Sequence, residues 1–489
     1  MEQTKIHETN ETSANSNGGQ KVDKEKILAY VILGFLGLTS FGFGGLQYSY
    51  ILSAVGFLLA IAVLAFIPYQ GSKNENKALL YYAIPLGIFT LFSSFSKFHL
   101  DGQFSSISSG LINVFGIVAF FVLGFMARKM KYLSLKGILY AVLLGLALLS
   151  LISMIASLAE YGFFYAARYK GMVYYYDGIS YPIDGEYTML FGFNIAAVSL
   201  RYGLQYSFLL AASLVALLFV SPQEDKALFI TIASCGGLGL LSLIFVPYLA
   251  GLLLLIPVYA VGVILRFVKI PQATPKWEKI TAWAGLGVIG VLVLIVMING
   301  IADIKALNSG ALGRIFNNGR YLMPINEMIQ AMFWKQGASK TTFDLTALFG
   351  MSPSASGIWN GSSFSSGFYI KNRVFEFNAL YEGGLIAFLG LLVAIVFAII
   401  SLRKYLHSEE KISGAKMALV ALILGWFIFA SFESDSYPAV FYYENYSVYS
   451  SPIFQNSIFL VVLFLLGFSY TPIFRGQALK RKGVDDDED

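Results

Sequence analysis

The chain has 489 residues, of which 57% are hydrophobic and 13% are charged, and its formal net charge is +5. Soluble proteins average roughly 45–50% apolar and about 25% charged residues, so this composition excludes an ordinary soluble enzyme. The single cysteine, Cys235, excludes a disulfide framework and a cysteine-based zinc site. We therefore expect an all-α, polytopic membrane protein.

Twelve apolar runs approach the roughly 20 residues that a membrane-spanning helix needs. They centre on 27–45, 51–69, 78–95, 107–127, 136–158, 203–220, 227–244, 248–265, 281–300, 383–402, 417–431 and 456–473. The run at 187–201 is shorter and ends at Arg201, and its length favours an interfacial or re-entrant piece.

The expected spans divide the chain into five parts. These are a disordered cytoplasmic tail (1–26), transmembrane helices one to nine (27–301), a large extracytoplasmic loop with the candidate active site (302–382), helices ten to twelve (383–473) and a second cytoplasmic tail (474–489). The loop contains many aromatic residues, so we expect short helices on the outer membrane surface there.

The distribution of lysine and arginine predicts the orientation. Cytoplasmic loops carry an excess of these residues. With the N-terminus inside, 23 of the 34 cations fall on inner segments and 11 remain outside. Counting 187–201 as a full span would place the basic clusters at 266–279 and 403–416 outside. We expect a multi-pass protein of the cell membrane with both termini in the cytoplasm.

Most of the expected outer cations lie in one loop. Seven of the 11 belong to it or to its end: Lys305, Arg314, Arg320, Lys335, Lys340, Lys371 and Arg373. The guanidinium fork of arginine suits phosphate oxygens, which favours a site for a lipid that carries pyrophosphate. The alternatives are nonspecific contact with anionic headgroups, or pairing with Glu327, Asp344, Glu376 and Glu382.

Aromatic residues are the second outer feature. Tyr174, Tyr175 and Tyr176 stand in the first long outer loop, and Trp359 stands in the largest one. These rings are candidates to bind sugar by stacking and hydrogen bonding, and the alternative is the ordinary aromatic belt of the membrane interface. The glycine- and serine-rich stretch 352–367 indicates either a flap over a site or a flexible linker.

The sequence lacks the residues that ion-coupled transport, metal binding and nucleotide binding by a phosphate loop would need. The expected span cores contain no Asp, Glu, Lys, Arg or His, which disfavours an ion-coupled transporter. The three histidines are too far apart in the expected topology to hold a metal. The sequence has no phosphate-binding loop. We therefore expect no metal and no cofactor.

Two segments of the large loop and the span that follows it carry a family resemblance. They read NNGRYLMPINEMIQAMFWKQGAS (317–339) and NRVFEFNALYEGGLIAFLG (372–390). In order, spacing and membrane side they resemble the bacterial O-antigen polymerase and ligase superfamily of integral membrane glycosyltransferases. The match is strongest over about 315–400, and with the expected twelve-helix layout it covers most of the chain.

The resemblance implies a donor glycan on undecaprenyl pyrophosphate, outer arginines that bind the pyrophosphate, and no metal. By position Arg320 is the implied pyrophosphate ligand. The His-Asn pair of the ligases falls on Arg373-Val374 here, which favours a polymerase. The family's Ser-Arg at helix eight is also missing, and Arg201 or Arg314 are candidates to replace it.

The expected function is polymerisation of lipid-linked oligosaccharide repeats into a surface polysaccharide. Arg320, Arg373 and Arg314 would stabilise the leaving group, and Glu376 or Glu382 would act as the base. The structural alternatives are a helix N-terminal role for Glu382 and an ion pair with Arg373 for Glu376.

Three other functions stay open: a ligase that transfers the glycan to another acceptor, a lipid-linked sugar flippase or solute transporter, and a noncatalytic scaffold. The expected partners are the undecaprenyl-pyrophosphate-linked oligosaccharide, the lipid bilayer, and a flippase and chain-length regulator of the same pathway. No nucleic acid is expected.

Overall fold

The structure is a computed structural model of the chain. It describes residues 24–41, 46–66, 73–95, 105–161, 172–176, 179–183, 187–190, 193–196, 200–223, 225–245, 249–264, 266, 280, 282–291, 348–349, 357–359, 364–366, 375–406, 413–432 and 457–470. Some side chains within these ranges are not described.

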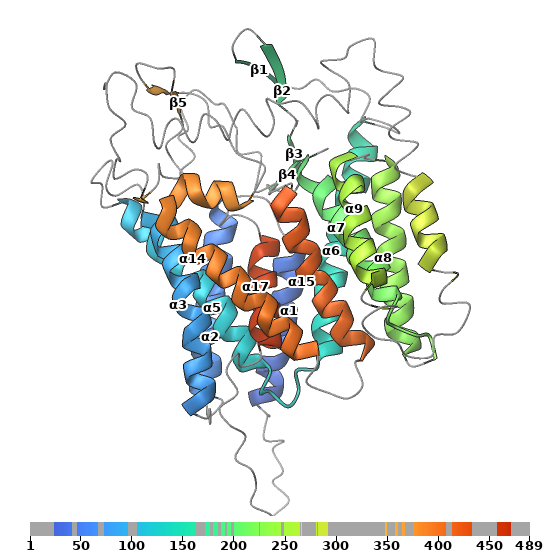
Figure 1. The fold of residues 1–489 in the computed structure, drawn as a ribbon. Helices are drawn as coiled ribbons and strands as arrows, with labels where there is room; N and C mark the ends of the chain where they lie inside the picture. The colour runs from blue at the N-terminus through green and yellow to red at the C-terminus, as the bar shows by residue number, and fades with distance from the viewer. Residues whose placement is uncertain are drawn as a thin grey trace, which may run out of the picture.

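Apolar helices form the packed part of the molecule (Figure 1). The labelled helices are α1 (Lys24–Phe41), α2 (Leu46–Phe66), α3 (Lys73–Phe95), α5 (Ser105–Ala127), α6 (Leu135–Tyr161), α7 (Leu200–Leu217), α8 (Lys226–Phe245), α9 (Leu249–Ile264), α14 (Phe375–Leu406), α15 (Gly414–Phe432) and α17 (Ser457–Ser469). Each overlaps one of the predicted apolar runs, and the helical class of the packed core is confirmed.

Three short antiparallel hairpins accompany the helices. They pair β1 (Met172–Tyr176) with β2 (Ile179–Ile183), β3 (Tyr187–Leu190) with β4 (Phe193–Ala196), and β5 (Gly357–Trp359) with β6 (Phe364–Ser366). The first two belong to one predicted outer loop and the third to the largest one. The apolar stretch 187–201 thus forms a hairpin followed by the start of α7. In the large loop, 352–367 contributes a hairpin where only a flap or linker was expected.

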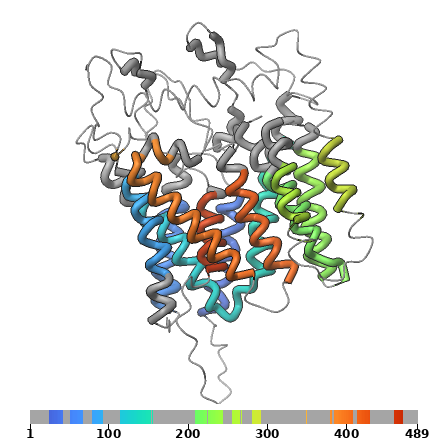
Figure 2. The backbone as a smooth tube through the Cα atoms, in the orientation of Figure 1, coloured from blue at the N-terminus to red at the C-terminus, as the bar shows by residue number. Residues whose placement is uncertain are grey.

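Helix α17 lies at the centre of the bundle (Figure 2). All of its residues from Phe459 to Tyr470 are buried, on every side of the helix. A helix that is apolar all round is stable only inside other helices. Helices α5, α1, α15 and α14 surround it, with α5 as its main neighbour.

Glycines allow α5 and α17 to approach closely. A Cβ added to Gly124 of α5 would stand 2.0 Å from the carbonyl oxygen of Phe464, and a Cβ added to Gly467 of α17 would stand 2.0 Å from that of Phe121. The contact is reciprocal, so each helix backbone fills the space above the other's glycine. Such small-residue crossings are typical of helices that pack in membranes, where van der Waals contact drives association.

The exterior of the bundle is apolar. Large hydrophobic side chains are exposed on α1, α2, α3, α6 and α14, with Leu58 of α2 63% exposed. Two stretches, Leu135–Ile152 and Gly383–Leu406, are long and apolar enough to cross a membrane. Nine shorter apolar helical stretches of 10–17 residues accompany them among the described residues. This exterior fits association with a membrane, and the full count of twelve spans remains a prediction.

Two cationic residues and two tyrosines from four helix ends meet at one end of the bundle, here called the basic end. Arg128, after α5, donates a hydrogen bond from Nη1 to the Tyr470 carbonyl after α17, at 2.7 Å. The Tyr405 ring near the end of α14 has its centroid 5.9 Å from Arg128 Cζ and 5.0 Å from Lys416 Nζ of α15. Both distances lie within the range of cation–π attraction. Two basic clusters predicted to share a membrane side therefore share one end of the fold.

Asp225 interacts with the first turns of both α6 and α8. Its carboxylate accepts a hydrogen bond from the Leu228 backbone N–H at 3.0 Å, which caps α8. The same carboxylate forms an ion pair with Lys136 at the start of α6. The hydrogen bond from Lys136, followed by the one from Leu228, lowers the pKa of Asp225 from its usual value. Both bonds favour the ionised carboxylate.

Candidate functional site

Helix α14 is broken at Gly384. The backbone there has φ 71° and ψ −170°, a combination confined essentially to glycine because a side chain would clash. The helix changes direction at this residue, and its first turns lie across the end of the bundle before the chain descends along α3 (Figure 1). We call residues 375–383 the outer segment of α14, and the end of the bundle opposite the basic end the loop end.

The break falls at the start of the apolar stretch Gly383–Leu406. Inside a bilayer every backbone N–H and C=O needs a partner within the protein, whereas at its boundary water supplies one. A break at residue 384 frees the backbone groups of one turn. Its position at the edge of the apolar stretch therefore keeps the cost of the broken helix low.

The part of α14 beyond the break is fixed against α3. A Cβ added to Gly390 would stand 3.0 Å from both the Pro85 carbonyl oxygen and the Phe89 nitrogen of α3. Gly390 is six residues from Gly384, or about 9 Å along the helix at a rise of 1.5 Å per residue. The close contact thus holds the helix one to two turns from the break.

Part of the predicted large loop docks on the same end of α3. The Phe349 ring stacks on the Phe92 ring near the end of α3, with centroids 5.9 Å apart and an interplanar angle of 18°. Phe92 lies one turn beyond Phe89, which contacts Gly390. The structure therefore brings together the end of α3, the broken start of α14 and a point in the middle of the loop.

The two candidate carboxylates occupy different positions on the outer segment. Residues 376, 379, 380 and 383 follow the i, i+3, i+4, i+7 spacing of one helix face. Ala379, Leu380 and Gly383 are buried. By this spacing residue 376 lies on the same helix face as residues 379, 380 and 383, whereas residue 382 falls outside it. The side chains of both glutamates lie outside the described part of the structure.

The other predicted site residues are not brought together by the described residues. Tyr174, Tyr175 and Tyr176 lie in β1, where their backbone partners are Tyr181, Ser180 and Ile179. Trp359 lies in β5 opposite Phe364, and Arg201 lies in the first turn of α7. Arg314, Arg320 and Arg373 lie outside the described residues. The described part holds no group of three or more His, Cys, Asp or Glu placed to bind a metal.

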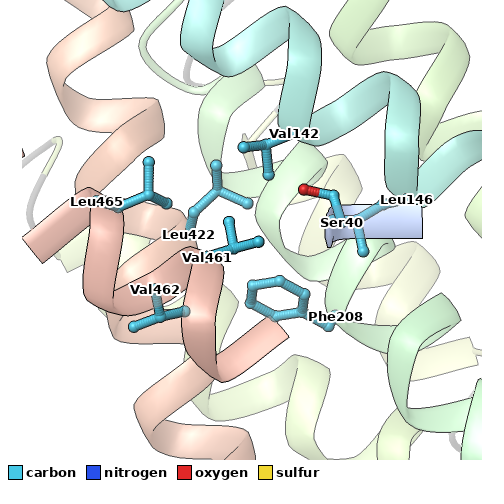
Figure 3. Close-up of a pocket in the computed structure, with 8 residues that line it drawn as sticks. All are labelled: Ser40, Val142, Leu146, Phe208, Leu422, Val461, Val462 and Leu465. Carbon is cyan, nitrogen blue, oxygen red and sulfur yellow. The ribbon is translucent and has the colours of Figure 1, made fainter. Parts of the chain in front are cut away.

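A cavity in the middle of the bundle is apolar. It is small, about 10 Å³, and lies where α1, α6, α7, α15 and α17 meet, lined by Ser40, Val142, Leu146, Phe208, Leu422, Val461, Val462 and Leu465 (Figure 3). The Ser40 hydroxyl, the one polar side chain in the lining, donates to the Leu36 carbonyl at 2.8 Å. This cavity offers no group to a charged or sugar ligand.

Sequence reasoning missed the break in α14 and the contact of Phe92 with Phe349. The doubled glycine at 383–384, directly after a glutamate and before an apolar run, was the available signal for the break. Sequence spacing carries no signal for the ring contact, because the two phenylalanines are more than 250 residues apart.

The described structure defines a helical protein with an apolar exterior and two helices long enough to span a membrane. No protein-family model and no curated protein matches the chain. The resemblance of 317–339 and 372–390 to the O-antigen polymerase and ligase superfamily therefore stays a prediction from the sequence.

Proposed function

We propose that this chain is a multi-pass membrane glycosyltransferase that polymerises lipid-linked oligosaccharide repeats on the outer face of the cell membrane. The observation that carries the proposal is the broken start of α14. There the EGGLIAFLG segment packs along α3, whose end contacts the loop residue Phe349. A glutamate-bearing segment at the edge of an apolar bundle suits a substrate that has a lipid tail in the membrane and a sugar in water.

The proposed reaction transfers a glycan from its lipid carrier. The hydroxyl oxygen of an acceptor sugar forms a bond to the anomeric carbon of the growing chain. The bond between that carbon and the pyrophosphate oxygen breaks, and its electron pair leaves with undecaprenyl pyrophosphate. The hydroxyl proton passes to a carboxylate and then to water. Neither a metal nor a cofactor takes part.

Arginines and glutamates have different roles in the proposed reaction. Arg320, with Arg373 and Arg314, would bind the pyrophosphate and stabilise the negative charge that grows on it. Glu376 or Glu382 would accept the proton. Tyr174, Tyr175, Tyr176 and Trp359 are the proposed sugar contacts. Both chain ends are proposed to be cytoplasmic, on the side of the basic end.

The apolar centre of the bundle favours a transferase over a transporter. A flippase or permease needs a polar path through the membrane, and polar or charged side chains inside a membrane mark such paths. The described central cavity is lined by one hydroxyl, already bonded, and otherwise by apolar side chains. The only buried charged side chain among the described residues is Lys416, at the basic end.

Purified protein in lipid vesicles tests the proposed function. Supplied with lipid-linked single repeats and no ATP or ion gradient, the wild-type chain is expected to produce a ladder of longer lipid-linked glycans on a gel. Repeats that stay single but cross the vesicle membrane would instead identify a transporter. Finished glycan moved onto a different acceptor, without any lengthening, would identify a ligase.

The same assay separates the two carboxylates. Glu376→Gln is expected to slow repeat joining by about 100-fold or more, the usual contribution of a general base. The spacing places residue 376 on the helix face of residues 379, 380 and 383, which are buried. Glu382→Gln is the matched control and is expected to stay within about tenfold of wild type. A large loss only in Glu382→Gln would transfer the role to Glu382, and no loss in either variant would remove both from the mechanism.

A further inference from the structure

We infer that Gly384 is a positioning residue for the proposed reaction: its glycine-only backbone conformation sets the outer segment of α14, and Glu376 with it, at the membrane boundary. The inference rests on the proposed function for its kinetic consequence. Its geometric content, a bent and fixed outer segment, stands independently. It adds to the mechanism a residue that has no side chain and carries out no chemistry itself.

The bend in α14 depends on Gly384. It is the one glycine with positive φ among the described residues. Proline does not account for the change in direction, since α14 contains none. Sharp kinks arise at proline, at glycine, or at an insertion into the hydrogen-bond ladder. Any other residue at 384 would be strained at φ 71° and ψ −170°.

Packing contacts hold α14 on both sides of the bend. Beyond it, Gly390 packs so closely on α3 that an added Cβ would stand 3.0 Å from the Pro85 carbonyl oxygen and the Phe89 nitrogen. Before it, Ala379 is 0% exposed and Leu380 is 9% exposed, so the outer segment is packed rather than solvated. Because both segments are packed, the bend between them is fixed in one direction. The backbone conformation of Gly384 makes that direction possible.

A straight α14 would displace residue 376 by a large distance. Residue 376 precedes Gly384 by eight positions. In a continuous helix it would stand about 12 Å beyond the break along the axis of α14, at a rise of 1.5 Å per residue. In the bent form it lies across the loop end. Since misplacement by 1 Å can cost about 100-fold in rate, relaxation of the bend by a small fraction of this distance is enough to stop the reaction.

Kinetics of purified variants test the positioning role. Gly384→Ala is expected to keep the KM for lipid-linked repeats within about twofold while kcat falls at least tenfold, because binding and catalysis depend on different groups. Gly384→Asn should behave as alanine does, since this backbone region admits essentially only glycine. Gly87→Ala is the matched control: Gly87 is a helical glycine of α3, and an added Cβ meets nothing within 4 Å.

Distance measurement tests the bend itself, whether or not the chain is a polymerase. In a Cys235→Ser background, which removes the single cysteine, spin labels at Asn378→Cys and Leu91→Cys report the separation of the outer segment from α3. Gly384→Ala is expected to shift this separation by several Å, and Gly87→Ala to leave it unchanged. A wild-type separation that matches a straight α14 overturns the inference even when Gly384→Ala fails to fold.

The two failures are distinguishable. A wild-type chain that joins no repeats but shows the bent distance removes the proposed function and leaves the bend. A wild-type chain that joins repeats, together with a Gly384→Ala variant of unchanged kcat, removes the positioning role and leaves the proposed function. A Gly384→Ala loss that merely follows a lower amount of folded protein, with normal kcat per folded molecule, also removes it.

Discussion

Gly467→Ala is expected to destabilise the protein strongly, by about 2–3 kcal/mol of unfolding free energy, the upper part of the range for overpacked sites. The added Cβ would stand 2.0 Å from the Phe121 carbonyl oxygen and 2.9 Å from the Phe125 nitrogen. Both are backbone atoms of α5, so neither can rotate away. The two helices must separate at the centre of the bundle, where α17 is buried on every side. Thermal unfolding of the purified protein measures the effect.

A second glycine supplies the control. Gly34 of α1 is helical and exposed, and an added Cβ there meets nothing within 4 Å. Gly34→Ala is therefore expected to be neutral or to stabilise by up to about 1 kcal/mol through helix propensity. Gly124→Ala should repeat the loss seen at Gly467, and the double variant should lose less than the sum, because one separation of the helices relieves both clashes. An unfolding temperature for Gly467→Ala equal to that of Gly34→Ala would disprove the close crossing.

Arg320→Ala is expected to abolish long polymer while the protein remains in the membrane at its normal level. If Arg320 stabilises the departing pyrophosphate, its loss should slow repeat joining by about 100- to 1,000-fold, the usual cost of removing one charge-stabilising donor. Single repeats should then accumulate on the lipid carrier. A gel of the lipid-linked glycans from cells that express the variant measures this outcome.

Two further variants test whether the effect is specific to the guanidinium group of Arg320. Arg320→Lys keeps the charge and loses the planar fork, so an intermediate rate is expected if the ligand is a pyrophosphate. Lys305→Ala removes a cation elsewhere in the same predicted loop and should leave polymer length unchanged. Normal polymer from Arg320→Ala would exclude Arg320 from the mechanism. Accumulation of long polymer on the carrier would instead indicate a ligase.

The helices were predictable because apolar runs of the right length leave few alternatives. The run predicted at 136–158 corresponds to α6 at Leu135–Tyr161, and the run at 227–244 corresponds to α8 at Lys226–Phe245. Their ends were less accurate at α14, which starts eight residues before the predicted run at 383. Because the outer segment mixes polar and apolar residues, a hydropathy pattern does not identify it as part of an apolar helix.

The hairpins were not predicted because local composition does not distinguish a tyrosine cluster at a membrane interface from a tyrosine strand. Tyr174, Tyr175 and Tyr176 pair with β2 across two intervening residues, and aromatic residues favour strands as well as interfaces. The candidate site was predictable in part. Glu376 and Glu382 were identified from the sequence. The break at Gly384 that follows both was not, because it is a backbone conformation that a glycine permits but does not dictate.

The central place of α17 has a consequence for how the molecule is made. This helix follows α1, α5, α14 and α15 in the chain, yet all of these pack around it. During synthesis from the N-terminus, these four helices are made before α17, so their packing around it is completed only after α17 has been made. The crossing of Gly124 and Gly467 can close only then. The bundle can therefore finish packing only in chains whose synthesis has continued beyond α17.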